Sequence, residues 1–376
     1  MSAIVGKNYE KPTLDLNFAE NKSLIDSHTG RNLITFSRSQ SGKEATYVGS
    51  DGLIKYAGAD EPRFDHDPET GECLGLLIEE QRENLLIYSD YSVNENTTDA
   101  QLEGLAIAPD GTLSARRYSV PSAGLDTINK LADPVIDGGT HTFSVWIRST
   151  GSTSQVRTIT GNPQFINEFD ITTSWQRYSF TKVNNVGTGS RAYVQMINVG
   201  DEIEVWGAQL EEGSFPTSYI PTKGSTVTRP ADEASITGSN FSSWYNQNEG
   251  TFFSSAKQEI VYGNSVIGIG AGSGSIYQFG NTLAEWWNGS DLLSGINAGS
   301  GGWTTGAKIA AAYTPSNRYA CFNSGLVASN TSSLPNGGKL EIGRQYNTTG
   351  AKRVTISRLT YWPKRLPDLE LQQLTK

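Results

Sequence analysis

The sequence predicts an all-β protein, made of tandem antiparallel sandwiches of the jelly-roll type with a small N-terminal β region. Three observations predict this fold class. Short runs of alternating apolar and polar residues recur along the chain, as in 13–18 and 140–149. Turn-forming residues separate these runs, and glycine alone occurs 40 times in 376 residues. Helical spacing of apolar residues is absent until the C-terminal end, where Leu371 and Leu374 follow Pro367.

The first 88 residues contain several short strand patterns. Leu14, Leu16 and Phe18 alternate with polar residues and therefore share one face of a predicted strand. Further strands are predicted over 33–36, 45–48, 53–56 and 74–78. We expect residues 1–88 to form a small β region that caps a neighbouring domain or docks onto a larger assembly.

Residues 89–222 show the pattern of a second unit. Strands are predicted over 113–120, 140–149, 175–182, 191–199 and 202–210, with polar loops between them. Several antiparallel strands of this length are typical of a double-sheet jelly roll. Gly213, Pro216 and Pro221 cannot continue a regular strand, so we expect the domain to end here in a linker open to proteolysis.

Residues 223–376 form the third predicted unit. Its strands are expected over 250–253, 266–269, 276–279, 284–287, 308–313, 319–322, 339–343 and 354–359, between turns rich in Gly and Asn. A short helix is expected after Pro367. The pattern predicts a second sandwich closed by that helix.

Composition excludes several classes of function. The formal net charge of −9 and the pI of about 5.0 argue against nucleic acid as a partner, because phosphate binding needs a basic surface. No apolar run reaches the roughly 18 residues of a membrane span, and residues 1–7 lack the pattern of a signal peptide, so we expect synthesis in the cytoplasm and no membrane insertion. Cys73 and Cys321 are too few for a disulfide framework.

Motifs of catalysis are also missing. The sequence has no nucleophile elbow, zinc-protease motif or phosphate-binding loop, and its three histidines are scattered. Glu202 and Glu204 have the i, i+2 spacing of a glycosidase carboxylate pair beside Trp206. A solvated charged strand face explains the same spacing, so we expect a protein that is not an enzyme.

Glycan binding requires an aromatic surface with polar groups at its rim. Trp146 and Arg148 alternate with Phe143, Val145 and Ile147, so they should lie on the outer face of their sheet. Tyr193 and Gln195 should occupy a comparable face, and Tyr277, Trp286, Trp287 and Trp303 form a second aromatic set in the third unit. As an alternative, Trp146 covers the sheet under a loop or lies in a subunit interface.

One acidic segment is compatible with a metal site. Asp65, Asp67 and Glu69 alternate ahead of Gly71, as in half of a calcium loop. The full loop spacing is absent and Pro68 favours an ordinary turn. No cofactor other than calcium is suggested.

Several phrases of the chain resemble structural proteins of tailed bacteriophages. The segments LDLNFAENKSLIDSHTGRNLITFSR, YVGSDGLIKYA, PRFDHDP and GLLIEEQRENLL occur in this order in the N-terminal region, and VWGAQLEEGSFPTSYIPT closes the second unit. The phrases HTFSVWIRS and SWQRYSFT resemble carbohydrate-binding modules. The third unit, ending in SRLTYWPKRLPDLELQQLT, resembles a concanavalin A-like or laminin-G-like lectin sandwich.

This resemblance implies a non-enzymatic virion protein of the tail-fibre, baseplate-peripheral or surface-decoration type. It implies a place on the virion surface, other virion proteins and host-surface glycans as partners, and a homo-oligomer with a trimer as the first expectation. Two alternatives remain. One is a purely architectural virion protein whose jelly rolls mediate subunit packing, and the other is a polysaccharide depolymerase.

Overall fold

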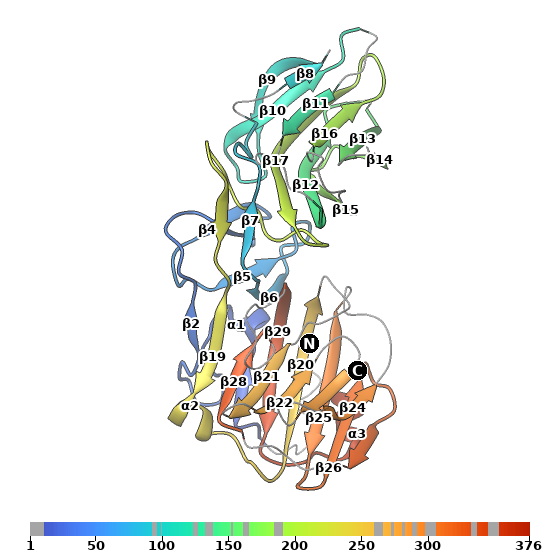
Figure 1. Cartoon of the computed structure of the whole chain (residues 1–376). Helices are drawn as coiled ribbons and strands as arrows, with labels where there is room; N and C mark the ends of the chain where they lie inside the picture. Colours follow the sequence, from blue (N-terminus) through green and yellow to red (C-terminus); the bar gives the residue numbers. More distant parts are fainter. Residues whose placement is uncertain are drawn as a thin grey trace.

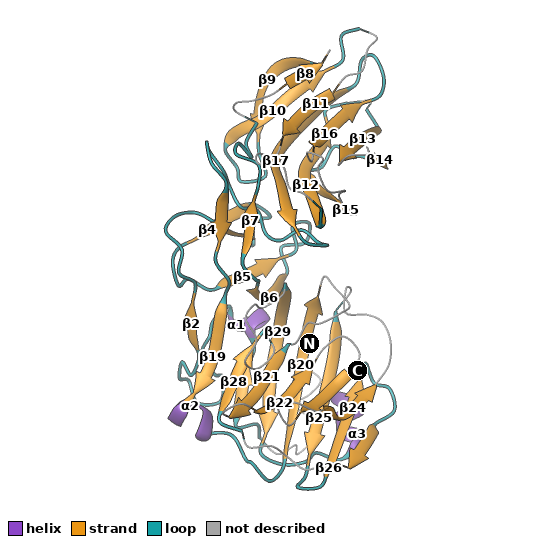
Figure 2. Cartoon of the chain, viewed as in Figure 1, coloured by secondary structure: helices purple, strands orange, loops and turns teal. Residues whose placement is uncertain are grey.

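The computed structural model confirms the all-β fold class (Figure 2). It describes residues 11–91, 96–98, 100–122, 127–131, 138–151, 153–160, 165–183, 191–258, 266–271, 274–279, 283–287, 292–297, 306–331, 337–344 and 353–376. Within these ranges the helices are short: α1 (Phe18–Asn21), α2 (Gly238–Ser242) and α3 (Asp368–Leu374). None of the helices in the described ranges is long and apolar enough to cross a membrane.

Two five-stranded antiparallel sheets form the jelly roll, at the top of Figure 1. The first sheet has the order β15-β12-β17-β10-β9 and the second the order β14-β13-β16-β11-β8. Their strands are β8 (Asn96–Thr98), β9 (Gln101–Ile107), β10 (Leu113–Ser119), β11 (Thr127–Leu131), β12 (Thr140–Ser149), β13 (Gln155–Thr160), β14 (Phe165–Asp170), β15 (Gln176–Val183), β16 (Arg191–Met196) and β17 (Glu202–Glu212). Phe143, Val145 and Ile147 pack with Val156 and Val194 in the core between the sheets.

The C-terminal sandwich also has two sheets. One has the order β27-β26-β25-β20-β29-β6-β5, with β1 also paired to β29, and the other has the order β2-β19-β28-β21-β22-β23-β24. The strands from the C-terminal half are β19 (Glu233–Thr237), β20 (Gly250–Gln258), β21 (Ile267–Ala271), β22 (Gly274–Phe279), β23 (Leu283–Trp287), β24 (Leu292–Asn297), β25 (Ala307–Tyr313), β26 (Asn317–Phe322), β27 (Ala328–Thr331), β28 (Lys339–Ile342) and β29 (Val354–Trp362). A continuous apolar core lies between these sheets.

The N-terminal strands belong to this C-terminal sandwich, which corrects the expected separate region over residues 1–88. They are β1 (Leu14–Leu16), β2 (Thr35–Ser37), β5 (Arg63–His66) and β6 (Cys73–Ile78). In the sheet, Leu14 pairs with Tyr361 and Leu76 with Ile356. Gly75 has φ +122°, and a Cβ there would lie 2.0 Å from the Ile356 carbonyl oxygen. The alternating segment 14–18 therefore contributes a strand whose sheet partner lies more than 300 residues later in the sequence.

Two small two-stranded sheets lie outside the sandwiches. The hairpin of β3 (Ala45–Val48) and β4 (Ile54–Ala57) is one of them. The other pairs β7 (Arg82–Asn84) with β18 (Val227–Arg229), the two segments that lead into and out of the jelly roll. Ile54 joins the apolar cluster on the outer face of the jelly roll, and its N–H donates to the Pro109 carbonyl at 2.9 Å. The hairpin therefore contacts the jelly roll directly.

A buried group of charged residues, the junction cluster, joins the two chain segments that flank the jelly roll. It consists of Arg38, Arg63, Glu79, Arg229 and Asp232, whose side chains are all inaccessible to solvent. Asp232 binds Arg38 at 2.8 Å and Arg63 at 2.5 Å. Glu79 lies 2.8 Å from Arg63 and 3.5 Å from Arg229. Arg38, Arg63 and Glu79 come from phrases that sequence analysis singled out, whereas Arg229 and Asp232 lie outside them.

The junction cluster also holds the segment that was expected to be a linker. Ser218 donates to Glu79 through its backbone N–H at 2.7 Å and its hydroxyl at 2.6 Å. Burial alone would raise the pKa of Glu79, but Arg229, Arg63 and Arg353 outweigh it and lower this pKa well below its ordinary value. Residues 217–220 are buried. The expected exposed linker is therefore wrong over these residues, because Ser218 bonds to Glu79 of the cluster while Thr217 and Ile220 bond to Glu211 and Gln209 of β17.

Candidate binding face of the jelly roll

The outer face of sheet β15-β12-β17-β10-β9 carries Trp146, as strand alternation predicts. Trp146 lies opposite the core residues of its own strand and packs at the rim of a cluster containing Trp206 and Tyr219. The ring centroids of Trp146 and Trp206 are 5.4 Å apart, and those of Trp146 and Tyr219 are 5.7 Å apart, both in edge-to-face geometry. The ring is half-buried. We call the outer surface formed by Arg117, Arg148, Trp175 and Glu204, next to this cluster, the binding face.

The flat side of the Trp146 ring is covered by Arg177. The two residues are direct cross-strand partners, and the guanidinium carbon lies 4.4 Å from the ring centroid. Arg177 is held there because it donates to the Thr217 carbonyl at 2.6 Å and to the Ser144 hydroxyl at 2.8 Å. On that side a sugar cannot stack unless Arg177 moves. Arg177 of the neighbouring strand therefore occupies one side of the Trp146 ring, and a sugar contact at Trp146 stays a prediction.

Glu204 organises the polar part of the binding face. It lies on β17 and is only 1 % exposed, whereas Arg117 and Arg148 on the flanking strands are 42 % and 29 % exposed. Arg117 Nη2 lies 2.6 Å from Glu204 Oε1, and Arg148 Nε lies 2.5 Å from Oε2. The hydrogen bond with Glu204 raises the pKa of Arg117. One buried carboxylate thus fixes two partly exposed guanidinium groups side by side.

Trp175 supplies the aromatic part of the binding face. The Arg148 guanidinium carbon lies 4.7 Å from the Trp175 ring centroid, and the indole N–H donates to the Ile107 carbonyl at 3.1 Å. The ring is partly exposed. Sequence analysis did not select Trp175 as a site residue, although it opens the strand predicted over 175–182 and lies in the phrase SWQRYSFT. In the structure β15 begins one residue later, at Gln176.

The binding face therefore presents a fixed, partly exposed aromatic ring with guanidinium donors next to it, one of which, Arg148, covers part of the ring as Arg177 covers Trp146. A sugar offers C–H surfaces that pack on an indole and hydroxyls that accept from arginine. Because each group is already held by a protein partner, little side-chain ordering remains to oppose binding.

Tyr193 and Gln195 are not brought together with Trp146. They lie on β16, which belongs to the second sheet of the jelly roll. Gln195 is 6 % exposed, although it was expected on an open face. Its neighbours β11 and β13 flank it on both sides, with Thr127 and Arg157 as the paired residues. The side chain of Tyr193 lies outside the described residues.

The second aromatic set lies in the seven-stranded sheet or outside the described residues. Tyr277 is in β22, and Trp286 and Trp287 are in β23. The pairing of β23 with β24 shifts register between Trp286 and Trp287, so simple strand alternation does not assign the two adjacent tryptophans to opposite faces. Their side chains lie outside the described part of the chain, as does the whole of Trp303.

Two of the three carboxylates proposed for calcium, those of Asp65 and Asp67, accept hydrogen bonds within the protein. Asp65 accepts from the Val48 N–H at 2.8 Å, and burial raises the pKa of this carboxyl. Asp67 accepts from the N–H groups of Glu69 and Thr70 at 3.0 and 2.8 Å, which closes an ordinary turn. Among the described residues, no three acidic, histidine or cysteine side chains converge as metal ligands. The calcium interpretation is corrected to a capped turn.

Glu202 and Glu204, the candidate carboxylate pair, also have fixed partners. Glu204 is held by Arg117 and Arg148, and Glu202 accepts from the Thr150 hydroxyl at 2.5 Å. Glu202 is partly exposed and lies 3.8 Å from Arg117. Together these acids position basic side chains at the binding face.

Comparisons with known proteins return structural similarity alone. No protein-family model matches the chain, and no curated protein matches it. Among solved structures, the chain is similar to a mutant of the family 29 carbohydrate-binding module CBM29-2, with 12% identity and a TM-score of 0.27, covering 35% of this chain and 96% of that chain. It is also similar to the CBM40 module of Ruminococcus gnavus IT-sialidase bound to α2,3-sialyllactose, with 15% identity and a TM-score of 0.30, covering 35% of this chain and 84% of that chain. At these TM-scores the fold assignment rests on the strand pairing described above.

Proposed function

We propose that this protein binds glycans through the binding face of its jelly roll and that it is not an enzyme. The observation that carries the proposal is the partly exposed Trp175 ring, fixed beside Arg148 and Arg117 by the buried Glu204. Stacking on an indole and hydrogen bonding to guanidinium groups are the two contacts that recognition of a sugar needs.

We further propose that the protein is a structural component of a tailed-phage virion, displayed at its surface for attachment to host glycans. The resemblance of its phrases to phage structural proteins supports this role. Four of these phrases supply Arg38, Arg63, Glu79 and Ser218, which meet in or on the junction cluster. Weak glycan contacts gain avidity when several copies face one surface, which favours a homo-oligomer, with a trimer expected first.

Glycan-array binding by the whole chain tests the proposal. We expect at least one oligosaccharide to bind the wild type and to lose about tenfold in affinity, or 1.4 kcal/mol, with Trp175→Ala. Trp146→Phe is the matched control, because it keeps a ring beneath Arg177 and should retain wild-type affinity.

The other interpretations predict different results. A purely architectural virion protein would bind no glycan on the array. A depolymerase would release reducing ends from a host polysaccharide, and we expect no release. The homo-oligomer would be contradicted if mass measurement showed a monomer that is present as a single copy per particle. That result would not bear on glycan binding, which the array tests.

A further inference from the structure

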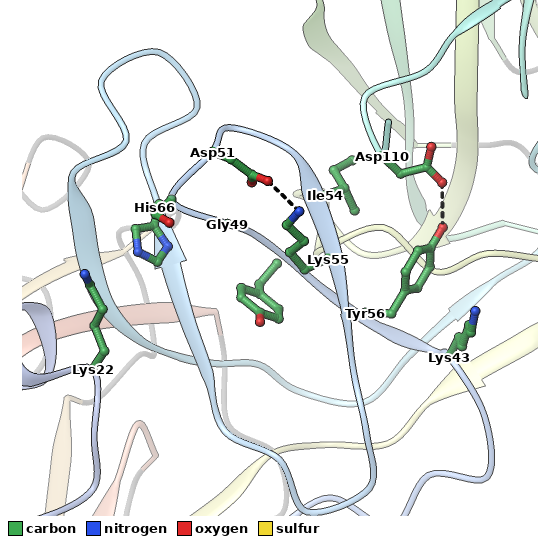
Figure 3. A pocket seen from close by; sticks show the side chains of 11 residues that line it. Lys22, Lys43, Gly49, Asp51, Ile54, Lys55, Tyr56, His66 and Asp110 are labelled. Atoms are coloured by element: carbon green, nitrogen blue, oxygen red, sulfur yellow. Dashed lines mark hydrogen bonds and ion pairs between the residues drawn. The ribbon is translucent and has the colours of Figure 1, made fainter. Parts of the chain in front are cut away.

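A second surface feature lies at the β3–β4 hairpin and is lined by none of the residues of the binding face, although its Ile54 belongs to the apolar cluster against which Trp175 packs. It is a hollow of about 740 Å³, in the ~300–1,000 Å³ range of small-molecule pockets. The hairpin supplies most of its wall, including Tyr47 and Tyr56, and Asp110 reaches it from the jelly roll (Figure 3). The hollow is therefore bounded by two parts of the chain that are distant in sequence.

His66 gives the hollow an unused hydrogen-bonding group. The residue lines the hollow and is 6 % exposed. Its Nδ1 lies 2.9 Å from the Val48 carbonyl oxygen. Because a carbonyl can only accept, Nδ1 carries the proton, and the neutral ring then offers Nε2 as an acceptor. Nε2 has no hydrogen-bond partner, and a buried polar atom left in this state is costly. A hydroxyl donor from a ligand would satisfy it.

The hollow also has an ammonium group at each end. Figure 3 shows Lys22 on the same side as His66 and Lys43 on the far side, next to Tyr56. Lys55 is paired with Asp51 at 2.6 Å, whereas no described acidic side chain forms an ion pair with Lys22 or Lys43. The Lys43 ammonium lies 5.2 Å from the Tyr56 ring centroid. Lys22 holds a left-handed backbone conformation with φ +48°, which costs energy for a lysine.

The aromatic wall is fixed as firmly as the polar groups. The Tyr56 hydroxyl donates to Asp110 at 3.0 Å, which prevents rotation of the ring away from the hollow. Ile54 is buried beside it and anchors the hairpin to the jelly roll. The hollow thus combines two separated cations, one acceptor that needs a hydroxyl and two tyrosine rings.

We propose that this hollow binds an acidic oligosaccharide built from uronic acids. Carboxylates at separate sugar residues match the separated ammonium groups of Lys22 and Lys43, and a ring hydroxyl donates to His66 Nε2. Sugar C–H surfaces pack on the tyrosine rings. Inorganic phosphate fits less well, because one small ion cannot reach the ammonium groups at both ends of the hollow and has no C–H surface for the tyrosine rings. The site is separate from the binding face, so this proposal does not depend on glycan binding there.

Isothermal titration calorimetry on the whole chain tests this site, with trisaccharides of galacturonic, glucuronic and mannuronic acid as probes. At least one should bind the wild type and lose tenfold or more in affinity with the double variant Lys22→Gln/Lys43→Gln. His66→Asn keeps an amide N–H for the Val48 carbonyl but has no acceptor at the position of Nε2, and should lower affinity several-fold. Lys223→Gln, an exposed lysine outside the hollow, is the matched control and should bind as the wild type does.

Maltotriose and inorganic phosphate distinguish the recognised chemistry. Both should bind at least tenfold more weakly than the best uronic trisaccharide. If maltotriose binds as tightly as the best uronic trisaccharide, carboxylates are not required. If phosphate binds as tightly, the hollow recognises negative charge and not a sugar. Absence of binding by all three trisaccharides, or unchanged affinity in the double variant, would overturn the site itself. Trp175→Ala should leave this binding unchanged, which separates the outcome from that of the binding face.

Discussion

Replacing Glu79 by Gln should strongly destabilise the protein, because this carboxylate neutralises several buried arginines at once. It lies 2.8 Å from Arg63 and 3.5 Å from both Arg229 and Arg353. Ser218 donates to both carboxylate oxygens of Glu79, so glutamine can keep one of these hydrogen bonds, and the variant removes the charge together with the other bond. Leaving buried charges without their partner costs about 3–5 kcal/mol. For a folding unit of 150–250 residues this lowers Tm by roughly 6–20 °C.

Thermal and urea unfolding of the whole chain measure this effect. Glu69→Gln is the control, because Glu69 is exposed on a turn and the change should stay within about 0.5 kcal/mol. A loss below 1 kcal/mol for Glu79→Gln would refute the reasoning, because it would mean that the junction arginines are satisfied by carbonyl groups alone.

The remaining predictions concern pH, the tryptophan cluster, proteolysis and the thiols. The pKa of Glu79 is lower in the folded protein than its ordinary value of 4.5, so the carboxylate stabilises the fold fully above pH 4.5 and less as the pH falls below that value. The difference in unfolding free energy between the wild type and Glu79→Gln should therefore narrow in acid. Trp146→Ala should cost about 2–4 kcal/mol, measured by urea unfolding, because the ring packs against Trp206 and beneath Arg177. Limited proteolysis should spare 217–220, which is buried, and early cleavage there would contradict the described packing. Cys321 should react slowly with a thiol reagent at neutral pH, since burial raises the pKa of its thiol, and fast labelling would count against this.

Local patterns predicted the strands and the sides that their residues occupy. The alternation in 140–149 correctly assigned Phe143, Val145 and Ile147 to the core and Trp146 to the opposite face. Such alternation is a property of a single strand, so it can be recognised without knowing the partner strands. The closing helix after Pro367 was predicted for the same reason, from spacing within one segment.

Pairings between distant segments could not be predicted in this way. The apolar face of 14–18 is equally compatible with an independent region and with addition to β29, because the strand's own residues do not identify its neighbour. Arg177 covers Trp146 because the two residues lie opposite each other in the pairing of β12 with β15. The register of that pairing is set by the two whole strands. Gln195 is likewise separated from Trp146 because β16 and β12 belong to different sheets of the jelly roll. Charged residues of the junction cluster looked like surface residues because their partners come from four separate segments.

The central claim is that Trp175 and its neighbouring arginines form a sugar site. A crystal structure of the whole protein with the best-binding oligosaccharide from the array tests it most directly. We expect a sugar ring packed against the Trp175 indole, with a sugar hydroxyl within about 2.7–3.2 Å of a guanidinium nitrogen of Arg148 or Arg117. If that oligosaccharide is one whose affinity Trp175→Ala lowers, an unchanged and empty binding face would contradict the claim, whereas a uronic oligosaccharide bound in the β3–β4 hollow would not.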